Sequence, residues 1–364
     1  MKLFLVIIAI IHGLIHLIGF TKAFKLAEVN QLTKTISKPI GILWFVTAIL
    51  FVVSAVLLFV KKDYWWTLAL AGVVLSQVLI FLNWPDAKFG TIANVIILIV
   101  SIIGYGTWSF YSKYKNDVEN GLQQETRLQN SLLNETDIQH LPDPVKKYLR
   151  YTGSIGKPKV KNFKIEFTGK IRKNEQSEWM PFTSEQYNFM ATSTRLFFMK
   201  AVMKHMPVAG YHCFNNGTAF MDIRLLSLFK VQYQSGKEMD VAETVTFFND
   251  MCCMAPATLI DRRINWLEAD TNKVKAAFTN NGITIFAWLY FNDKGELVNF
   301  ISDDRYSADA GKKLPWSTPL KDYKEISGYK LAGYAETIYS YPKADLCYGT
   351  FSLTNIKYNS KDFK

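Results

Sequence analysis

The stretch LFLVIIAIIHGLIHLIGF, residues Leu3–Phe20, is the first of four long apolar segments in the N-terminal third of the chain. The other three are Ile40–Val60, Trp65–Leu82 and Ile92–Phe110. Each is close to the ~20 residues that a helix needs to cross the hydrocarbon core of a bilayer. Short connections between segments are typical of an up-and-down bundle. The sequence therefore predicts a four-helix transmembrane anchor in residues 1–111, and the lipid bilayer as its first partner.

Charge says little about partners beyond the membrane. The chain of 364 residues carries a formal net charge of +11, and its basic residues are spread along the sequence. Nucleic-acid binding requires basic residues that cluster on one face, so we expect no nucleic-acid partner. A dispersed positive charge suits a surface that lies beside anionic lipid headgroups.

The sidedness of the anchor depends on lysines near the ends of the spans. Lysines are equally frequent at both ends, so the positive-inside rule does not decide the orientation. The first helix favours a cytoplasmic position for the loop Lys22–Lys38. That orientation would place the C-terminal domain on the extracytoplasmic side.

Two histidines lie within the first span. His12 and His16 are four residues apart, which places them on one face of a helix. Ionisable groups inside a membrane often serve a haem, a metal or a proton relay. However, no other span contains His, Cys, Asp or Glu, so we favour histidines that hydrogen-bond to neighbouring helices. We expect no metal and no cofactor.

The remaining sequence divides into a linker and a water-soluble domain. Residues 112–140 are rich in Asn, Gln, Glu and Ser, which predicts a polar, partly helical linker. Residues 141–364 begin with a short amphipathic helix at Pro144. They then change to alternation of apolar and polar residues, as in Phe163–Phe167, which is typical of half-buried strands. The domain boundaries that we expect are therefore 1–111, 112–140 and 141–364.

Tight turns connect the expected strands. Asn215-Asn216-Gly217 and Asn280-Asn281-Gly282 supply residues that tolerate positive φ in hairpins. Residues 240–261 interrupt the strands with helical periodicity and need a surface to pack on. We predict an α+β chain: a four-helix bundle followed by a curved, mostly antiparallel sheet, an incomplete barrel, with a few covering helices.

Several short motifs carry a family resemblance. They are LPDPVKKYLR at residues 141–150, APATLID at 255–261, Asp304-Arg305-Tyr306, and Pro315-Trp316. In these motifs the chain resembles a widespread bacterial family of unknown function, over almost all of residues 141–358. Some members are similarly anchored by helices, which implies a place in the bacterial inner membrane and cell envelope. The resemblance implies no catalytic activity.

The expected layout also resembles the periplasmic lipoprotein-carrier fold. That fold is an incomplete barrel, closed by helices, around an apolar cavity for acyl chains. The resemblance implies that the soluble domain binds a lipid or a lipoprotein.

The sequence offers little for catalysis. It contains no G-x-S-x-G elbow, no H-E-x-x-H pair and no glycine-rich phosphate loop. An enzyme would have to use residues such as Asp303, Asp304 and Arg305. These residues could also fix a polar headgroup or form a structural ion pair between strands, and we favour the ion pair.

Aromatic residues are the strongest positive sign of a ligand site. The segment Thr284–Phe291 is apolar on both faces, so both faces need cover, and a cavity along one face would accept a lipid. Core packing remains the simpler explanation for most aromatic residues. The ligand-binding candidates are Trp179, Phe182, Trp266, Trp288, Asp303, Arg305 and Trp316. We interpret the chain as a membrane-anchored envelope protein that binds a hydrophobic or amphiphilic ligand; the alternatives are a membrane-anchored enzyme and a structural or interaction module.

Overall fold

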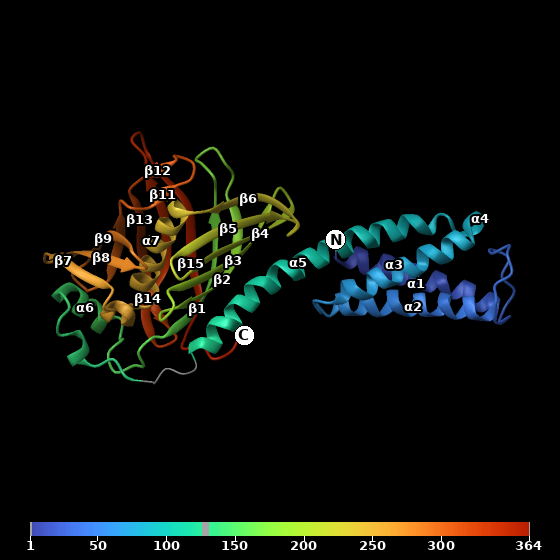
Figure 1. Ribbon diagram of the computed structural model, residues 1–364, viewed down its shortest axis with the longest axis horizontal. Coiled ribbons are helices and arrows are strands. Elements are labelled where there is room, and N and C mark those ends of the chain that lie inside the picture. The colour runs from blue at the N-terminus through green and yellow to red at the C-terminus, as the bar shows by residue number, and fades with distance from the viewer. Residues whose placement is uncertain (1, 126–130, 364) are drawn as a thin grey trace. The chain divides into compact units, whose positions relative to one another are not determined.

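The structure is a computed structural model that describes residues 2–125 and 131–363. Its contacts divide the chain into two units, residues 1–112 and 113–364 (Figure 1). Residues 126–130, which fall in the expected linker, lie outside the described residues, as do both terminal residues. The first unit contains α1 (Lys2–Ala23), α2 (Lys38–Phe59), α3 (Trp65–Leu82), α4 (Trp84–Ala87) and the first part of α5 (Gly90–Glu125).

Helices α1, α2, α3 and α5 are long and apolar enough to cross a membrane, as judged by length and composition. They coincide with the four predicted apolar segments and confirm that part of the fold. Small residues allow close packing in this unit. A Cβ on Gly13 would lie 3.1 Å from the Cβ of Phe51, and one on Gly72 would lie 3.0 Å from the Phe51 ring. Phe51 of α2 is therefore fully buried between α1 and α3.

The second unit is built around one large sheet. Its helices are the end of α5, η1 (Glu135–Ile138), α6 (Asp143–Tyr151), α7 (Lys237–Met254) and η2 (Pro256–Ile260). Its strands are β1 (Asn162–Ile171), β2 (Met180–Phe189), β3 (Thr194–Met203), β4 (Met206–Asn215), β5 (Thr218–Leu225), β6 (Phe229–Ser235), β7 (Ile264–Ala269), β8 (Lys273–Asn280), β9 (Ile283–Phe291), β10 (Leu297–Ser302), β11 (Tyr306–Ser307), β12 (Lys312–Lys313), β13 (Trp316–Ile326), β14 (Tyr329–Ser340) and β15 (Asp345–Tyr358).

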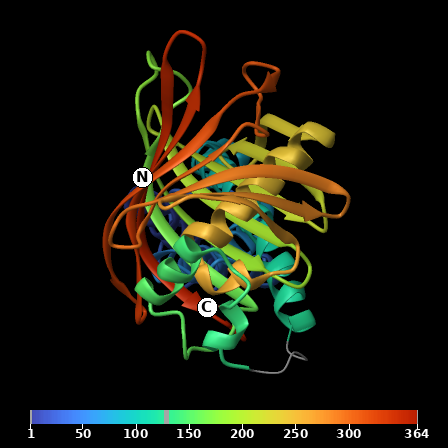
Figure 2. The same cartoon turned by 90° about the vertical axis from the view of Figure 1, so that its left-hand side faces the viewer.

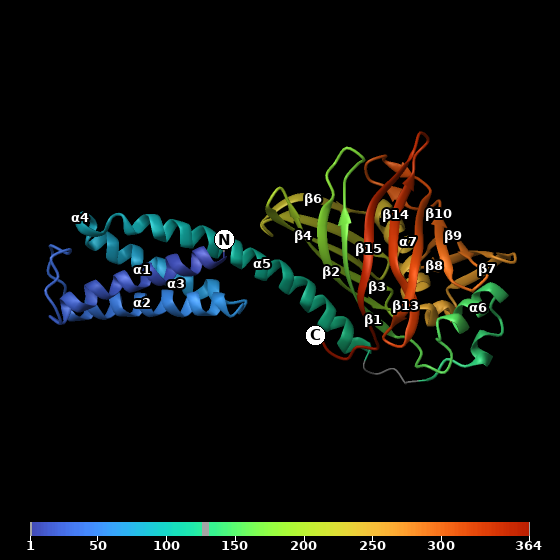
Figure 3. The ribbon, with the colours of Figure 1, turned by 180° about the vertical axis from the view of Figure 1, so that it is seen from behind.

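Thirteen of these strands form one antiparallel sheet in the order β6-β5-β4-β3-β2-β1-β15-β14-β13-β10-β9-β8-β7. Helix α7 contacts β5 and β6 near one edge and also β9 and β10 near the other. One helix can reach both ends only if the sheet curves around it, as Figures 2 and 3 show from two directions. In the described residues β6 and β7 do not pair, so the sheet remains open. The predicted curved, antiparallel, incomplete barrel with a few covering helices is confirmed.

Side chains of β3 show how the two faces of the sheet differ. Arg195, Phe197 and Met199 face the concave side and α7, whereas Phe198 faces the convex side. The end of α5 covers this convex surface. Tyr114 of α5 is fully buried and its ring centroid lies 5.3 Å from that of Phe198.

The segment expected as a polar linker is therefore largely packed in its described parts. Val118 and Leu122 of α5 are buried like Tyr114, and Leu133 and Ile138 belong to the main core. Their apolar side chains are spaced too widely among polar neighbours to form a continuous apolar run. The sequence pattern indicated helix in this segment but not its packing on the sheet.

Strand β9 differs from the expectation that both of its faces are covered. Ile285, Ala287 and Leu289 face the core, but Phe286 on the opposite face is 45% exposed. Trp288 on that face lies under two lysines, with Lys273 Nζ 5.2 Å from the centre of its ring. No residue of β9 lines the concave cavity, and lysine side chains rather than a cavity cover Trp288 on the outer face.

Candidate functional site

A cavity of about 260 Å³ lies between α7 and the concave face of the sheet. Its lining comes from β1 to β5, α7 and β13 to β15, so the curvature of the sheet creates it. Apolar side chains dominate the walls, among them Phe167, Phe197, Met199, Met221, Met254 and Trp316. A concave apolar space with a few polar groups is the usual form of a small-molecule site.

A buried ionic cluster joins α7 to the sheet at this cavity. Arg195 of β3 donates from Nε to Asp250 Oδ2 at 2.7 Å and from Nη1 to Glu243 Oε2 at 3.0 Å. Its Nη2 donates to Gln186 Oε1 at 2.9 Å. Burial raises the pKa of Asp250, and the nearby guanidinium of Arg195 opposes that rise. Arg195 is thus fully engaged by two carboxylates and one amide.

His212 of β4 lies beside this cluster. Its Nδ1 is 4.0 Å from Glu243 Oε1. Burial lowers the pKa of His212 to about 4, so the imidazole is neutral near pH 7. A neutral imidazole adds a polar group to the cavity wall without adding charge.

Arg172 and Arg305 are the other two arginines in the wall; Arg172 donates to the backbone oxygen of Cys347, and Arg305 has different partners. It donates from Nε to Thr246 Oγ1 at 3.3 Å and from Nη1 to the hydroxyl of Tyr339. Its Cζ lies 4.8 Å from the ring centre of Trp316. Among the described residues no carboxylate lies within ion-pair distance of Arg305. Both of its hydrogen bonds go to hydroxyl groups, and the negative charge of Glu243 acts on it only from beyond ion-pair distance.

The two aspartates that precede Arg305 in the sequence do not join it. Asp304 accepts a hydrogen bond from the backbone N–H of Phe286 at 2.8 Å and pairs with Lys313 at 2.8 Å. Asp303 is exposed. The favoured ion pair between these aspartates and Arg305 was therefore wrong, and the three residues do not form one catalytic cluster.

The aromatic candidates are distributed over different parts of the domain. Trp316 lines the cavity, and Phe182 lies behind the lining with its ring centroid 5.1 Å from that of Phe351. Trp179 lies under Arg172, whose Cζ is 4.5 Å from the ring centre. Trp266 packs partly buried against the main core, and Trp288 lies on the convex face. Of the seven candidates, the structure thus brings Arg305 and Trp316 together at the cavity.

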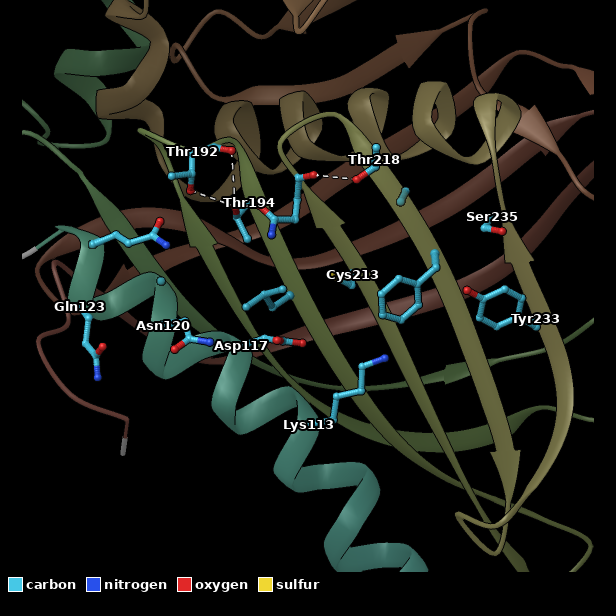
Figure 4. Close-up of a pocket in the computed structure, with 16 residues that line it drawn as sticks. Lys113, Asp117, Asn120, Gln123, Thr192, Thr194, Cys213, Thr218, Tyr233 and Ser235 are labelled. Atoms are coloured by element: carbon cyan, nitrogen blue, oxygen red, sulfur yellow. Dashed lines mark hydrogen bonds between the residues drawn. The ribbon is translucent and has the colours of Figure 1, made fainter.

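A second hollow of about 880 Å³ lies on the convex side, between the end of α5 and β3 to β6 (Figure 4). Lys113, Asp117 and Asn120 of α5 face threonines and a tyrosine from the strands. Tyr211 donates to Asp117 Oδ2 at 2.7 Å, which ties the helix to the sheet. This hollow is wide and has a larger polar share in its lining than the concave cavity, so it is less suited to an apolar ligand.

The ionic cluster was not recognisable as a unit in the sequence. Glu243 and Asp250 are seven residues apart, two helical turns, in a helix whose other residues are mostly apolar. Arg195 stands in a strand that is mostly apolar, between Thr194 and Leu196. Charged residues in apolar surroundings signal a buried role, but only the fold shows that these three meet.

The described residues offer no comparable cluster of metal-ligating side chains. Within residues 2–125 and 131–363, no group of three or more His, Cys, Asp or Glu side chains is placed to hold a metal ion.

Nine solved chains match at a distance, among them the following three. A domain from Vibrio parahaemolyticus assigned to outer membrane lipoprotein sorting is 8% identical, with a TM-score of 0.35 over 56% of this chain and 87% of that one. A LolA superfamily protein from Nitrosomonas europaea is 8% identical, with a TM-score of 0.34 over 60% of this chain and 94% of that one. A DUF1329 family protein from Desulfovibrio piger is 9% identical, with a TM-score of 0.34 over 59% of this chain and 91% of that one.

No curated protein matches the sequence. In contrast, the pattern that defines one protein family matches residues 131–351, which is more than half of the chain. This range contains every strand from β1 to β14, together with α6 and α7, and every residue that lines the concave cavity. The chain belongs to the family of unknown function DUF6544.

Proposed function

We propose that the second unit binds a single-chain anionic amphiphile in the concave cavity. The headgroup lies on Arg305 and the acyl chain lies along the apolar walls. The observation that carries this proposal is the arginine itself, which lines an apolar cavity without a carboxylate partner in the described residues.

Physical chemistry favours an anion at this position. A charge removed from water costs several kcal/mol unless a counter-charge and hydrogen bonds compensate it. Hydroxyl groups of Thr246 and Tyr339 satisfy donors but supply no negative charge. A carboxylate or a phosphate would supply a negative charge as well as hydrogen-bond acceptors. A guanidinium fork binds these groups through two parallel hydrogen bonds. Arg195 is a poorer candidate, since Asp250 and Glu243 already neutralise it.

The size and lining of the cavity favour one acyl chain. Its volume of about 260 Å³ is just below the range of ~300–1,000 Å³ that is typical of small-molecule pockets. Two chains would need more room. Met199, Met221 and Met254 add flexible side chains that adapt to a chain of variable shape.

The anchor supplies a reason for a lipid ligand. Four apolar helices are compatible with a membrane anchor. A domain tethered to a bilayer meets amphiphiles at high local concentration. Within this proposal the domain acts in the bacterial cell envelope, on the extracytoplasmic side of the inner membrane.

The test is native mass spectrometry of the full chain released from mild detergent. Palmitate, lysophosphatidate and hexadecanol are titrated in parallel, because they share a chain length but differ in headgroup. We expect adducts with one or both anions and weak binding of hexadecanol. The preference between palmitate and lysophosphatidate identifies the headgroup.

Matched variants locate the site. Arg305→Met should weaken anion binding about tenfold or more, which corresponds to ~1.4 kcal/mol. Arg262→Met removes an exposed arginine and should leave binding unchanged. Equal adducts in the wild type and Arg305→Met, or no preference for anions over hexadecanol, would overturn the proposal.

A further inference from the structure

The first unit contains a cavity of its own, separate from the sheet domain. It has a volume of about 360 Å³. Its lining includes His12 and His16 of α1, Trp44 of α2 and Ala93 of α5, with Asp86 of α4 at one end. Two histidines and an indole thus meet in a helix bundle whose remaining walls are largely apolar.

The hydrogen bonds of the histidines fix which nitrogens carry protons. His16 Nδ1 lies 2.8 Å from the backbone oxygen of His12, which can only accept, so Nδ1 donates. His16 Nε2 then accepts from Ser76 Oγ at 2.9 Å, which uses the single hydroxyl proton of Ser76. His12 Nε2 therefore donates, to Asn94 Oδ1 at 2.9 Å. These bonds to α3 and α5 agree with the expectation that the histidines join neighbouring helices.

This arrangement leaves His12 with an available lone pair. Because its proton is on Nε2, the neutral ring exposes Nδ1 as an acceptor. No hydrogen bond to Nδ1 is present within the described part of the chain, and His12 lines the cavity. Asn94 in turn donates to Gln77 at 3.0 Å, so this network holds the ring of His12 in place.

Trp44 contributes an unpaired donor to the same wall. Its side chain is 3% exposed, and its Nε1 has no hydrogen-bond partner among residues 2–125 and 131–363. The indole ring lies 5.2 Å from the ring of His16, measured between centroids. A buried N–H without a partner costs free energy, which a ligand that accepts a hydrogen bond would recover.

The lining also limits the chemistry of the ligand. It contains no lysine or arginine, and the ammonium group of nearby Lys22 already donates to the backbone oxygen of Leu32. Asp86 already accepts two hydrogen bonds from Thr33, at 2.7 and 2.9 Å. Ile15 both lines the cavity and is 50% exposed on the surface of the bundle. The cavity therefore reaches the surface that would face lipid, and a neutral, membrane-soluble molecule can enter from there.

We propose that this cavity binds the oxygen-substituted ring of a membrane-soluble quinone or quinol. A ring carbonyl accepts a hydrogen bond from Trp44, and a quinol hydroxyl donates to Nδ1 of His12. The planar ring packs against the aromatic and aliphatic walls. Its apolar tail leaves past Ile15 into the bilayer. This site is independent of the amphiphile site proposed for the sheet domain.

The test uses the full chain in phosphatidylcholine nanodiscs and an azidoquinone with a decyl tail. After illumination, peptide mapping by mass spectrometry identifies the labelled residues. We expect labels between His12 and Ile18 or between Ala87 and Ala93, and we expect unlabelled decylubiquinone to suppress them. Labels spread over the lipid-facing surface, or insensitive to decylubiquinone, would overturn the proposal.

Cavity-filling variants provide a second criterion. Ala93→Phe and Ala87→Leu each place a larger side chain in the cavity and should reduce specific labelling about tenfold or more. Ala71→Phe makes a matching change at an exposed position of α3 and should have no effect. Size-exclusion profiles show which variants fold, and the milder Ala87→Leu decides the result if Ala93→Phe aggregates. Unchanged labelling in a folded cavity-filling variant would show that the quinone binds elsewhere.

Discussion

Arg195 of β3 and Asp250 of α7 form a buried ion pair, with 2.7 Å between Nε and Oδ2, although 55 residues separate them in the chain. Gln186 of β2 also donates to the same carboxylate oxygen at 2.7 Å. In the described residues, α7 is the only long helix inside the curved sheet. The pair joins this helix to the strands that form the concave wall of the sheet. This polar cluster therefore links α7, which also packs through apolar side chains such as Phe247 and Phe248, to the wall of the cavity.

The first prediction concerns this pair. Arg195→Met should lower the free energy of unfolding by about 3–5 kcal/mol, because it leaves two buried carboxylates without their counter-charge. Chemical denaturation followed by tryptophan emission measures the change. Arg262→Met is the matched control on the surface and should change stability by less than about 0.5 kcal/mol. A loss below about 1 kcal/mol in Arg195→Met would mean that water already compensates the carboxylates.

The second prediction concerns Glu125 at the end of α5. Burial raises the pKa of its carboxyl to about 7, although Asn162 donates to Oε2 at 2.8 Å. A pKa raised in the folded state means stability that is present below the unfolded value of 4.5 and is lost as pH rises to about 7. Glu125→Gln should therefore raise the thermal midpoint at pH 8. The gain should disappear at pH 4. An equal gain at both pH values would show that the effect does not come from ionisation.

The third prediction concerns the boundary of the soluble unit. Tyr114, Val118 and Leu122 are buried against the convex face of the sheet, so residues 113–364 should fold as a soluble domain. A fragment of residues 138–364 should be less stable by several kcal/mol, since each large apolar side chain contributes ~1.5–3 kcal/mol when fully buried. Thermal unfolding of the two fragments provides the comparison. Tyr114→Ala in the longer fragment should reproduce part of the loss. Identical midpoints for both fragments would mean that α5 contributes nothing to the domain.

The fourth prediction concerns Ala287 in β9. Its side chain is 1% exposed, faces the main core and does not line the cavity. Ala287→Trp should therefore destabilise the domain by about 1–3 kcal/mol through overpacking. Phe286→Trp, at the neighbouring exposed position, should be close to neutral. Anion binding should persist in the folded fraction of Ala287→Trp, and its selective loss without destabilisation would place Ala287 in the ligand site.

Much of the architecture could be predicted from local patterns. Apolar segments of about 20 residues indicate spans because the thickness of the bilayer fixes their length. Alternation in β1 and turn residues such as Asn281-Gly282 indicate antiparallel strands because side chains point to opposite faces of a strand. The curved sheet and its inserted helix followed from these patterns, and the family motifs agreed with them.

The candidate site could be predicted only in part, because its members depend on long-range geometry. Asp304 and Arg305 are adjacent in sequence, yet Asp304 turns to the backbone of Phe286 while Arg305 turns into the cavity. Adjacent residues often face opposite ways, so proximity in sequence does not indicate an ion pair. Trp288 and Trp316 both stand in strand patterns, but the register of the sheet places them on different faces.

The sequence by itself determined which segments are apolar enough for a membrane, which alternate as strands, and which family the domain resembles. These properties depend on residues within a few positions of one another. Only the tertiary structure decided that Arg195 meets Asp250, that Arg305 has no carboxylate partner in the described residues, and that α5 packs on the sheet. Those facts depend on the curvature of a thirteen-stranded sheet, which brings distant residues together and which no local pattern specifies.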